Sequence, residues 1–165
     1  MLYTDLDECI NVLTKLIINK TLHNIANNVG GPFGAGVIQI VDSKYRIVAV
    51  QSNEVLLRDD PTAHSEMLAI KEACKVLGKK MLDDCILVTT SRSCPMCLSA
   101  AMWARIPTIY YSEDYDKAHK HGFIDDDIYD YINGRNHIIK EVRIKNEVCD
   151  KLFAEWDKKT EKEMY

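Results

Sequence analysis

Two cysteines separated by two residues, Cys94 and Cys97, are the residues in this chain whose types and spacing first suggest chemistry. Cysteine pairs with this spacing occur in thioredoxin-like redox motifs, in structural zinc sites and in catalytic zinc centres. The spacing alone fits all three alternatives. The decision between them depends on which other side chains the fold brings to the pair.

A histidine and a glutamate in the segment DPTAHSEMLAI are candidates for that role. A catalytic zinc site needs three protein ligands and an open fourth position, and His64, Cys94 and Cys97 would supply the three. Glu66 would act as the base beside the metal-bound water. A redox pair leaves His64 and Glu66 unexplained, and a structural site has no obvious fourth ligand. We therefore expect one Zn²⁺ ion per chain.

These side chains need elements that place them together. Asp60-Pro61 is typical of a helix start, and an apolar stripe then predicts a helix that ends at Gly78. Pro95 likewise predicts a helix through residue 104, after the buried strand CILVTT. The partial positive charge of a helix N-terminus stabilises thiolates. Two neighbouring helix starts can therefore hold the four side chains at one place.

The remaining pattern predicts an α/β fold. Thr4-x-x-Asp7 resembles an N-terminal capping pair, and a first helix should run from there to about residue 28. GVIQIV and YRIVAVQ form a hairpin joined by residues 42–44. PTIYYS and the weaker HIIKEV are further strands, with helices over 114–121 and from 148 to about 162. Strands that alternate with helices after a hairpin favour a three-layer α/β/α sandwich with a central mixed sheet of about five strands.

Length and composition favour one domain over residues 1–165, with a helix and tail from about residue 148. No apolar run approaches the roughly 20 residues of a membrane span, so no membrane partner is expected. The N-terminal segment carries acidic residues early and does not resemble a signal peptide. Six cysteines without an export signal favour a reducing compartment, and we expect a cytoplasmic protein.

Charge argues against a nucleic-acid partner. The formal net charge is −4. The segment 113–130 has two lysines against seven acidic residues, which would repel a phosphate backbone: Glu113, Asp114, Asp116, Asp125, Asp126, Asp127 and Asp130. We therefore expect a small-molecule substrate.

The pattern H-x-E followed by C-x-x-C is identified as the signature of the zinc-dependent base deaminases. Further segments resemble the bacterial guanine deaminases of the cytidine-deaminase-like superfamily, from about residue 30 to residue 132: GGPFGAG, DPTAHSEMLAIKEACKVLG, LDDCIL, CPMCLSAAMWAR and GFIDDDIYDYI. The resemblance implies the α/β/α deaminase fold and the hydrolysis of guanine to xanthine and ammonia.

The resemblance also implies roles for residues outside the signature. Substrate-binding residues would be Asn53, Phe33 and Ala63, with Trp103 behind the base pocket. Asp125 would be a second catalytic carboxylate, near the exocyclic amine. Tyr165, from the partner subunit of a domain-swapped homodimer, would close the site.

The chemistry of the base agrees with an aspartate in the pocket. Guanine presents N1–H and its 2-amino group on one edge, and a carboxylate accepts from both donors. Adenine has an acceptor at N1 and no 2-amino group. Hydrolysis would occur at C2, with Glu66 delivering a proton to N3.

One departure from the family leaves the substrate open. Residues before the C-x-x-C in these deaminases usually read Glu-Pro, whereas this chain has Arg92-Ser93. Alternatives are a deaminase of guanosine or another small heterocycle and a tRNA adenosine deaminase, which shares the signature. A non-catalytic zinc-binding domain is a further alternative, although a structural zinc does not need Glu66.

Overall fold

The predicted hairpin begins the sheet in this computed structural model, which describes residues 1–144 and 146–163. Strands β1 (Gly34–Val41) and β2 (Lys44–Ser52) pair antiparallel around a two-residue turn. Both turn residues have positive φ, 50° at Asp42 and 60° at Ser43. This backbone geometry is that of the turns that match the twist of two paired strands. The hairpin prediction is confirmed.

Two more strands complete the sheet in the order β2-β1-β3-β4. Strand β3 (Cys85–Ser91) pairs antiparallel with β1, and β4 (Thr108–Glu113) pairs parallel with β3. The first five residues of β3 are buried, as expected for a strand covered on both faces. The sheet is therefore mixed, as predicted.

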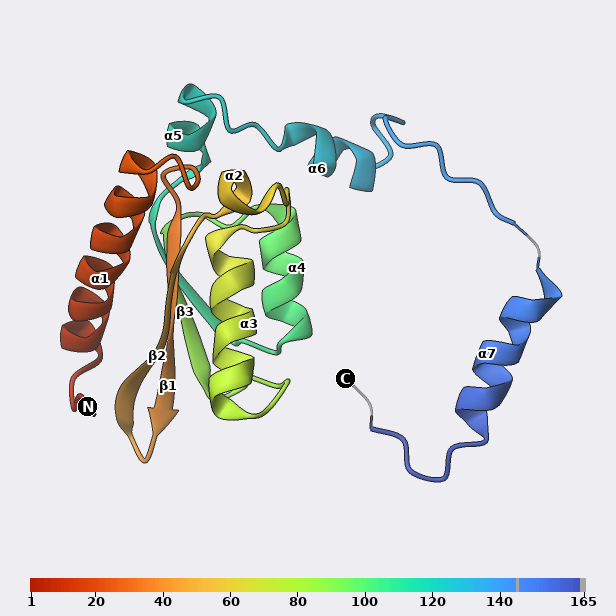
Figure 1. The fold of residues 1–165 in the computed structure, drawn as a ribbon, viewed down its shortest axis with the longest axis horizontal. Helices are drawn as coiled ribbons and strands as arrows, with labels where there is room; N and C mark the ends of the chain where they lie inside the picture. The colour runs from red at the N-terminus through yellow and green to blue at the C-terminus, as the bar shows by residue number, and fades with distance from the viewer. Residues whose placement is uncertain (145, 164–165) are drawn as a thin grey trace. The chain divides into compact units, whose positions relative to one another are not determined.

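Helices cover both faces of the sheet (Figure 1). Helix α1 (Leu6–Ala26) packs on one face, where its Cys9, Leu13 and Ile17 join a core cluster with residues of β1 and β3. Helices α3 (Ser65–Leu77) and α4 (Pro95–Trp103) lie on the other face over a second buried cluster. The predicted three-layer α/β/α sandwich is confirmed.

The sheet of the described residues has four strands rather than about five. The fifth, predicted from HIIKEV, would span residues 137–142, and the structure has no strand there. Its Ile138, Ile139 and Val142 are exposed. A β-branched run forms a strand only where another strand is available to pair with its backbone, and none pairs with this run.

Two helix starts differ from the prediction by a few residues. Helix α1 is capped by Asp5, whose Oδ1 accepts from the backbone N–H of Glu8, rather than by Thr4. The segment from Asp60 makes a turn, in which Thr62 N–H donates to Asp60 Oδ1. Helix α3 therefore begins only after His64, which is its N-cap residue. A short helix, α2 (Val55–Arg58), precedes this turn.

The chain divides into two compact units, Met1–Asp125 and Asp126–Tyr165. The first also contains α5 (Tyr115–Lys120), and the second contains α6 (Asp126–Ile132) and α7 (Glu147–Asp157). No helix within residues 1–144 and 146–163 is long and apolar enough to cross a membrane.

Candidate active site

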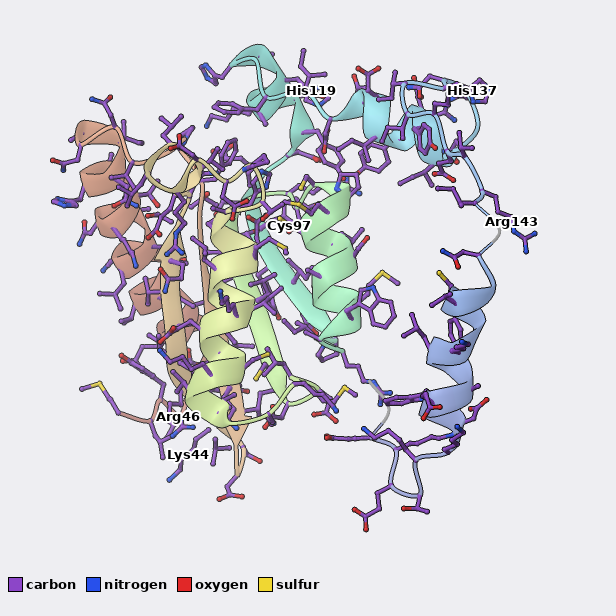
Figure 2. All side chains as sticks on the ribbon, turned by 45° about the vertical axis from the view of Figure 1, so that its right-hand side comes forward. Lys44, Arg46, Cys97, His119, His137 and Arg143 are labelled. Carbon is purple, nitrogen blue, oxygen red and sulfur yellow. The ribbon has the colours of Figure 1, made fainter. Side chains whose placement is uncertain are left out.

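The first turns of α3 and α4 hold the predicted ligands. These helices lie side by side with their starts at the same end (Figure 1). Cys94 is the N-cap residue of α4 and Pro95 is at its first turn, as predicted. Figure 2 labels Cys97 at this end of α4. The helix-start arrangement that the sequence predicts therefore exists, with His64 at the N-cap of α3.

The three ligand atoms lie at zinc-binding distances from one another. His64 Nδ1 is 3.6 Å from Cys94 Sγ and 3.5 Å from Cys97 Sγ, and all three atoms lie within 4.8 Å of one another. In a tetrahedral site with Zn–S about 2.3 Å and Zn–N about 2.05 Å, ligand nitrogen and sulfur stand about 3.6 Å apart. One imidazole and two thiols at this spacing fit Zn²⁺, and three ligands leave the fourth position open.

The two thiols are joined by a hydrogen bond that shifts their pKa values in opposite directions. A hydrogen bond from Cys97 lowers the pKa of Cys94, and the same hydrogen bond raises the pKa of Cys97. The hydrogen bond to Cys94 also raises the pKa of His64. Cys94 therefore loses its proton readily. Cys97 is expected to lose its proton when a metal cation binds in place of that proton.

Glu66 lies beside this group in the first turn of α3 and is only 7% exposed. Burial raises the pKa of its carboxyl, against the hydrogen bonds that lower it. Ser65 Oγ donates to Glu66 Oε2 over 3.0 Å and so orients the carboxylate. The Cys97 thiol also hydrogen-bonds to Glu66. A carboxyl that is buried and oriented next to a metal site can hold and transfer a proton.

Asn53 follows β2 and is 6% exposed. Its Oδ1 accepts from the backbone N–H groups of Gly31 and Val55, both over 3.2 Å. Two donors at one atom identify that atom as the amide oxygen. Nδ2 donates to no other group among the residues that the structure describes. The fold therefore uses the acceptor of Asn53 and leaves its donor available to a ligand.

Phe33 and Ala63 adjoin Asn53 through the backbone. Asn53 N–H donates to Phe33 O over 2.9 Å, and the next residue, Glu54, donates to Ala63 O over 3.0 Å. Ala63 is 1% exposed and precedes His64. The loop before β1, the end of β2 and the loop before α3 therefore meet.

Asp125 is partly buried and accepts a hydrogen bond from His119, whose Nε2 donates to Asp125 Oδ1 over 3.3 Å. The segment before it is anchored by Phe123, whose ring packs edge-on against Phe33 with centroids 4.7 Å apart. Sequence reasoning assigned no role to Phe123 or to His119. For Phe123, the available signal in the sequence was the Gly122-Phe123 pair, which ends the preceding helix.

Trp103 lies apart from the group. Trp103 is the last residue of α4, at the opposite end from Cys94, and is 68% exposed. Six residues of helix separate it from Cys97, a rise of about 9 Å, so within its own chain it does not back the site. Tyr165 lies outside the described residues.

Ser93 is a residue that sequence reasoning treated only as a departure from the family. Its Oγ is buried and has no hydrogen-bond partner among the described residues. It stands directly before the ligand Cys94.

Comparisons with known proteins agree with this geometry. A model of the MafB19-like deaminase family matches residues 17–154. The guanine deaminase of Bacillus subtilis is 41% identical over 119 residues, which cover 72% of this chain and 74% of that protein. A tRNA-specific adenosine deaminase of Aquifex aeolicus is 42% identical over 88 residues, 53% of this chain and 55% of the relative.

The solved structure of the Bacillus subtilis guanine deaminase superposes with a TM-score of 0.84 and 35% identity. That superposition covers 94% of this chain and 98% of the other. The chain therefore belongs to the MafB19-like deaminase family, which its helix-start histidine and cysteine pair had suggested.

Proposed function

We propose that this enzyme hydrolyses guanine to xanthine and ammonia. The observation that carries the proposal is the three-ligand group with the buried Glu66 beside it, in a chain 41% identical to a guanine deaminase. His64, Cys94 and Cys97 would hold one Zn²⁺. When bound, zinc supplies the positive charge that makes a water molecule nucleophilic near neutral pH.

Glu66 is the proton carrier of the proposed reaction. Once Cys97 is a metal ligand, its thiol no longer donates to Glu66, and the carboxylate can accept a proton from the attacking water. Burial favours the protonated form that results. Glu66 then donates this proton to N3 of the purine. The C2–O bond forms in this step. Glu66 then carries the proton of the new C2 hydroxyl to the 2-amino group, so that the C2–N bond breaks, ammonia leaves and the C2 carbonyl of xanthine remains.

Asp125 and Asn53 are the residues we assign to recognition of the base. Asp125 uses Oδ1 for His119, and Oδ2 remains to accept from the 2-amino group and N1–H of guanine. Asn53 Nδ2 would donate to an acceptor on the opposite side, such as O6 or N7. Adenine lacks the 2-amino donor, so the carboxylate discriminates against it. Phe33 and Ala63 would provide apolar contacts to the ring.

We also propose that the enzyme is a homodimer that exchanges its C-terminal helix. Three large apolar residues of α7, in the second unit, are exposed: Val148, Leu152 and Phe153 are 64%, 70% and 76% exposed. The spacing of four residues puts Val148 and Leu152 on one face of the helix, and Phe153 follows about 100° farther round, at the edge of that face. A partner copy would cover this face and bring Tyr165 to the site.

Sedimentation of the wild-type protein and of Phe153→Glu tests the dimer. We expect a dimer that the charged residue dissociates, with ammonia release lost on dissociation. A monomeric wild type that is fully active would contradict the exchange. We place this dimer in the cytoplasm and without nucleic acid, which the six free cysteines and the acidic 113–130 segment support.

Ammonia release from a panel of substrates tests the function: guanine, guanosine, adenine, cytosine and an RNA stem-loop. We expect guanine to react fastest and Glu66→Gln to be inactive with its zinc content unchanged. Preference for the RNA would favour the tRNA deaminase activity of the second relative. Zinc binding without ammonia release from any of them would favour a non-catalytic domain.

A further inference from the structure

Asp125 differs from the two aspartates that follow it in sequence. Asp126 and Asp127 begin helix α6 and are exposed, whereas the side chain of Asp125 is only 17% exposed. A buried carboxylate on a loop needs a partner that fixes its direction. The side chain that supplies the contact is His119, on α5 (Figure 2).

The end of α5 folds the chain back so that His119 and Asp125 can meet. Gly122 has φ of 85°, a conformation that glycine adopts without strain. Its N–H donates to His119 O over 2.9 Å, and Phe123 N–H donates to Ala118 O over 3.1 Å. These two bonds close the last turn of the helix and reverse the chain direction. The loop that carries Asp125 therefore returns beside the helix.

A stack of side chains holds the ring of His119. Tyr115, one helical turn earlier, stacks on it with centroids 6.2 Å apart and an interplanar angle of 29°. The guanidinium of Arg92 lies over Tyr115, 4.5 Å from the ring centroid. Arg92 also pairs with Asp114 over 3.4 Å, and its backbone N–H donates to Glu113 O over 2.8 Å. The loop before Cys94 is therefore attached to α5.

We propose that His119 is a positioning residue for Asp125 in the purine reaction, and that Arg92 and Tyr115 hold its ring in place. The inference rests on the proposed function, because it gives Asp125 a substrate to orient toward. His119 holds Oδ1, so Oδ2 stays aimed at the donors of the base. The series Arg92, Tyr115, His119 and Asp125 links the loop of the metal ligands to the second carboxylate. Arg92, the departure from the family pattern, acquires a structural role in this arrangement.

Two substitutions at His119 separate the hydrogen bond from the ring. His119→Phe keeps an aromatic ring against Tyr115 and removes the donor, whereas His119→Gln removes the ring and keeps an N–H donor. We expect kcat/KM for guanine to fall roughly tenfold in His119→Phe, the loss of about one hydrogen bond. In His119→Gln it should fall less than about threefold. His121→Phe, at an exposed histidine of the same turn, is the control and should match the wild type.

Zinc content and the melting temperature are measured in all four proteins, and both should be unchanged if His119 acts only on Asp125. Wild-type activity in His119→Phe, or equal losses in the Phe and Gln variants, would overturn the positioning role and leave the deaminase function standing. A wild-type protein that releases no ammonia from guanine would instead refute the proposed function, and the positioning role with it.

Discussion

Replacing Asn53 separates what its amide does for the fold from what it does for the substrate. Asn53→Ala removes the acceptor of two backbone N–H groups, those of Gly31 and Val55. Each hydrogen bond contributes about 1 kcal/mol net, so the free energy of unfolding should fall by about 2 kcal/mol. For a chain of this length, that corresponds to a melting temperature lower by roughly 4–8 °C.

Asn53→Asp keeps an oxygen at the same place and changes the other end of the side chain. The backbone N–H groups retain their acceptor, and charge-assisted bonds offset part of the cost of the buried carboxylate. We therefore expect a smaller loss of stability than in Asn53→Ala. The donor to the purine is replaced by an acceptor, which should cost about 1.5–3 kcal/mol in the transition state. That amount lowers kcat/KM roughly 10- to 150-fold.

Thermal unfolding followed by circular dichroism, zinc content and ammonia release from guanine should be measured on the same three proteins. We expect Asn53→Ala to have the lower melting temperature of the two variants. Asn53→Asp should lose less stability, and its kcat/KM for guanine should be lower than that of the wild type. An Asn53→Asp enzyme with wild-type kcat/KM would refute the assignment of Nδ2 to the substrate. A wild-type melting temperature in Asn53→Ala would refute the role of Oδ1 in the fold.

Three further predictions concern single side chains. Glu66→Gln should retain zinc and lose turnover by at least about a hundredfold; a turnover rate near that of wild type would contradict its role as proton carrier. Ser93→Ala removes a buried hydroxyl without a partner among the described residues. The free energy of unfolding, measured with urea, should therefore stay constant or rise by up to about 1 kcal/mol. A measurable decrease in this free energy would show that the hydroxyl is hydrogen-bonded. Partial burial acts to raise the pKa of Asp84, but hydrogen bonds from Lys79 and Gln39 outweigh it and lower the pKa to about 2. The stability from Asp84 is therefore present above about pH 4 and lost as the pH falls toward 2. Metal-free wild type should exceed metal-free Asp84→Asn in urea stability at pH 6, with a smaller difference near pH 2.5; a constant difference would contradict the shift.

Much of the fold follows from local patterns. The strand of continuous apolar residues, CILVTT, becomes the buried β3, and Pro95 marks the start of α4 within one residue. The start of α3 was less well predicted, because Asp60 bonds to Thr62 and forms a turn in place of a helix cap. HIIKEV has the composition of a strand without a strand to pair with. Local pattern predicts an element, while pairing depends on neighbours that are distant in sequence.

The candidate site, like the fold, could be predicted only in part from the sequence. The proximity of His64, Cys94 and Cys97 follows from their types and from helix starts on either side of one strand, and the structure brings them within 4.8 Å. The solvent exposure of Trp103 does not follow, because an aromatic residue on an alanine-rich helix is as consistent with a core as with a surface. The orientation of the Asn53 amide does not follow from the sequence either: Gly31 and Val55 both donate to its oxygen, and Nδ2 has no acceptor among the described residues.

The sequence by itself predicted the group of His64, Cys94 and Cys97 with Glu66 beside it, and the layered α/β arrangement, because each depends on residue type and spacing within short segments. Only the tertiary structure decided the surroundings of Asp125. In sequence it is the first of three aspartates, whereas in the fold its side chain is only 17% exposed and its Oδ1 is bonded to His119, beside the chain reversal at Gly122. Residue type specifies which chemistry is available, whereas the direction of a side chain depends on contacts that form only when the chain has folded.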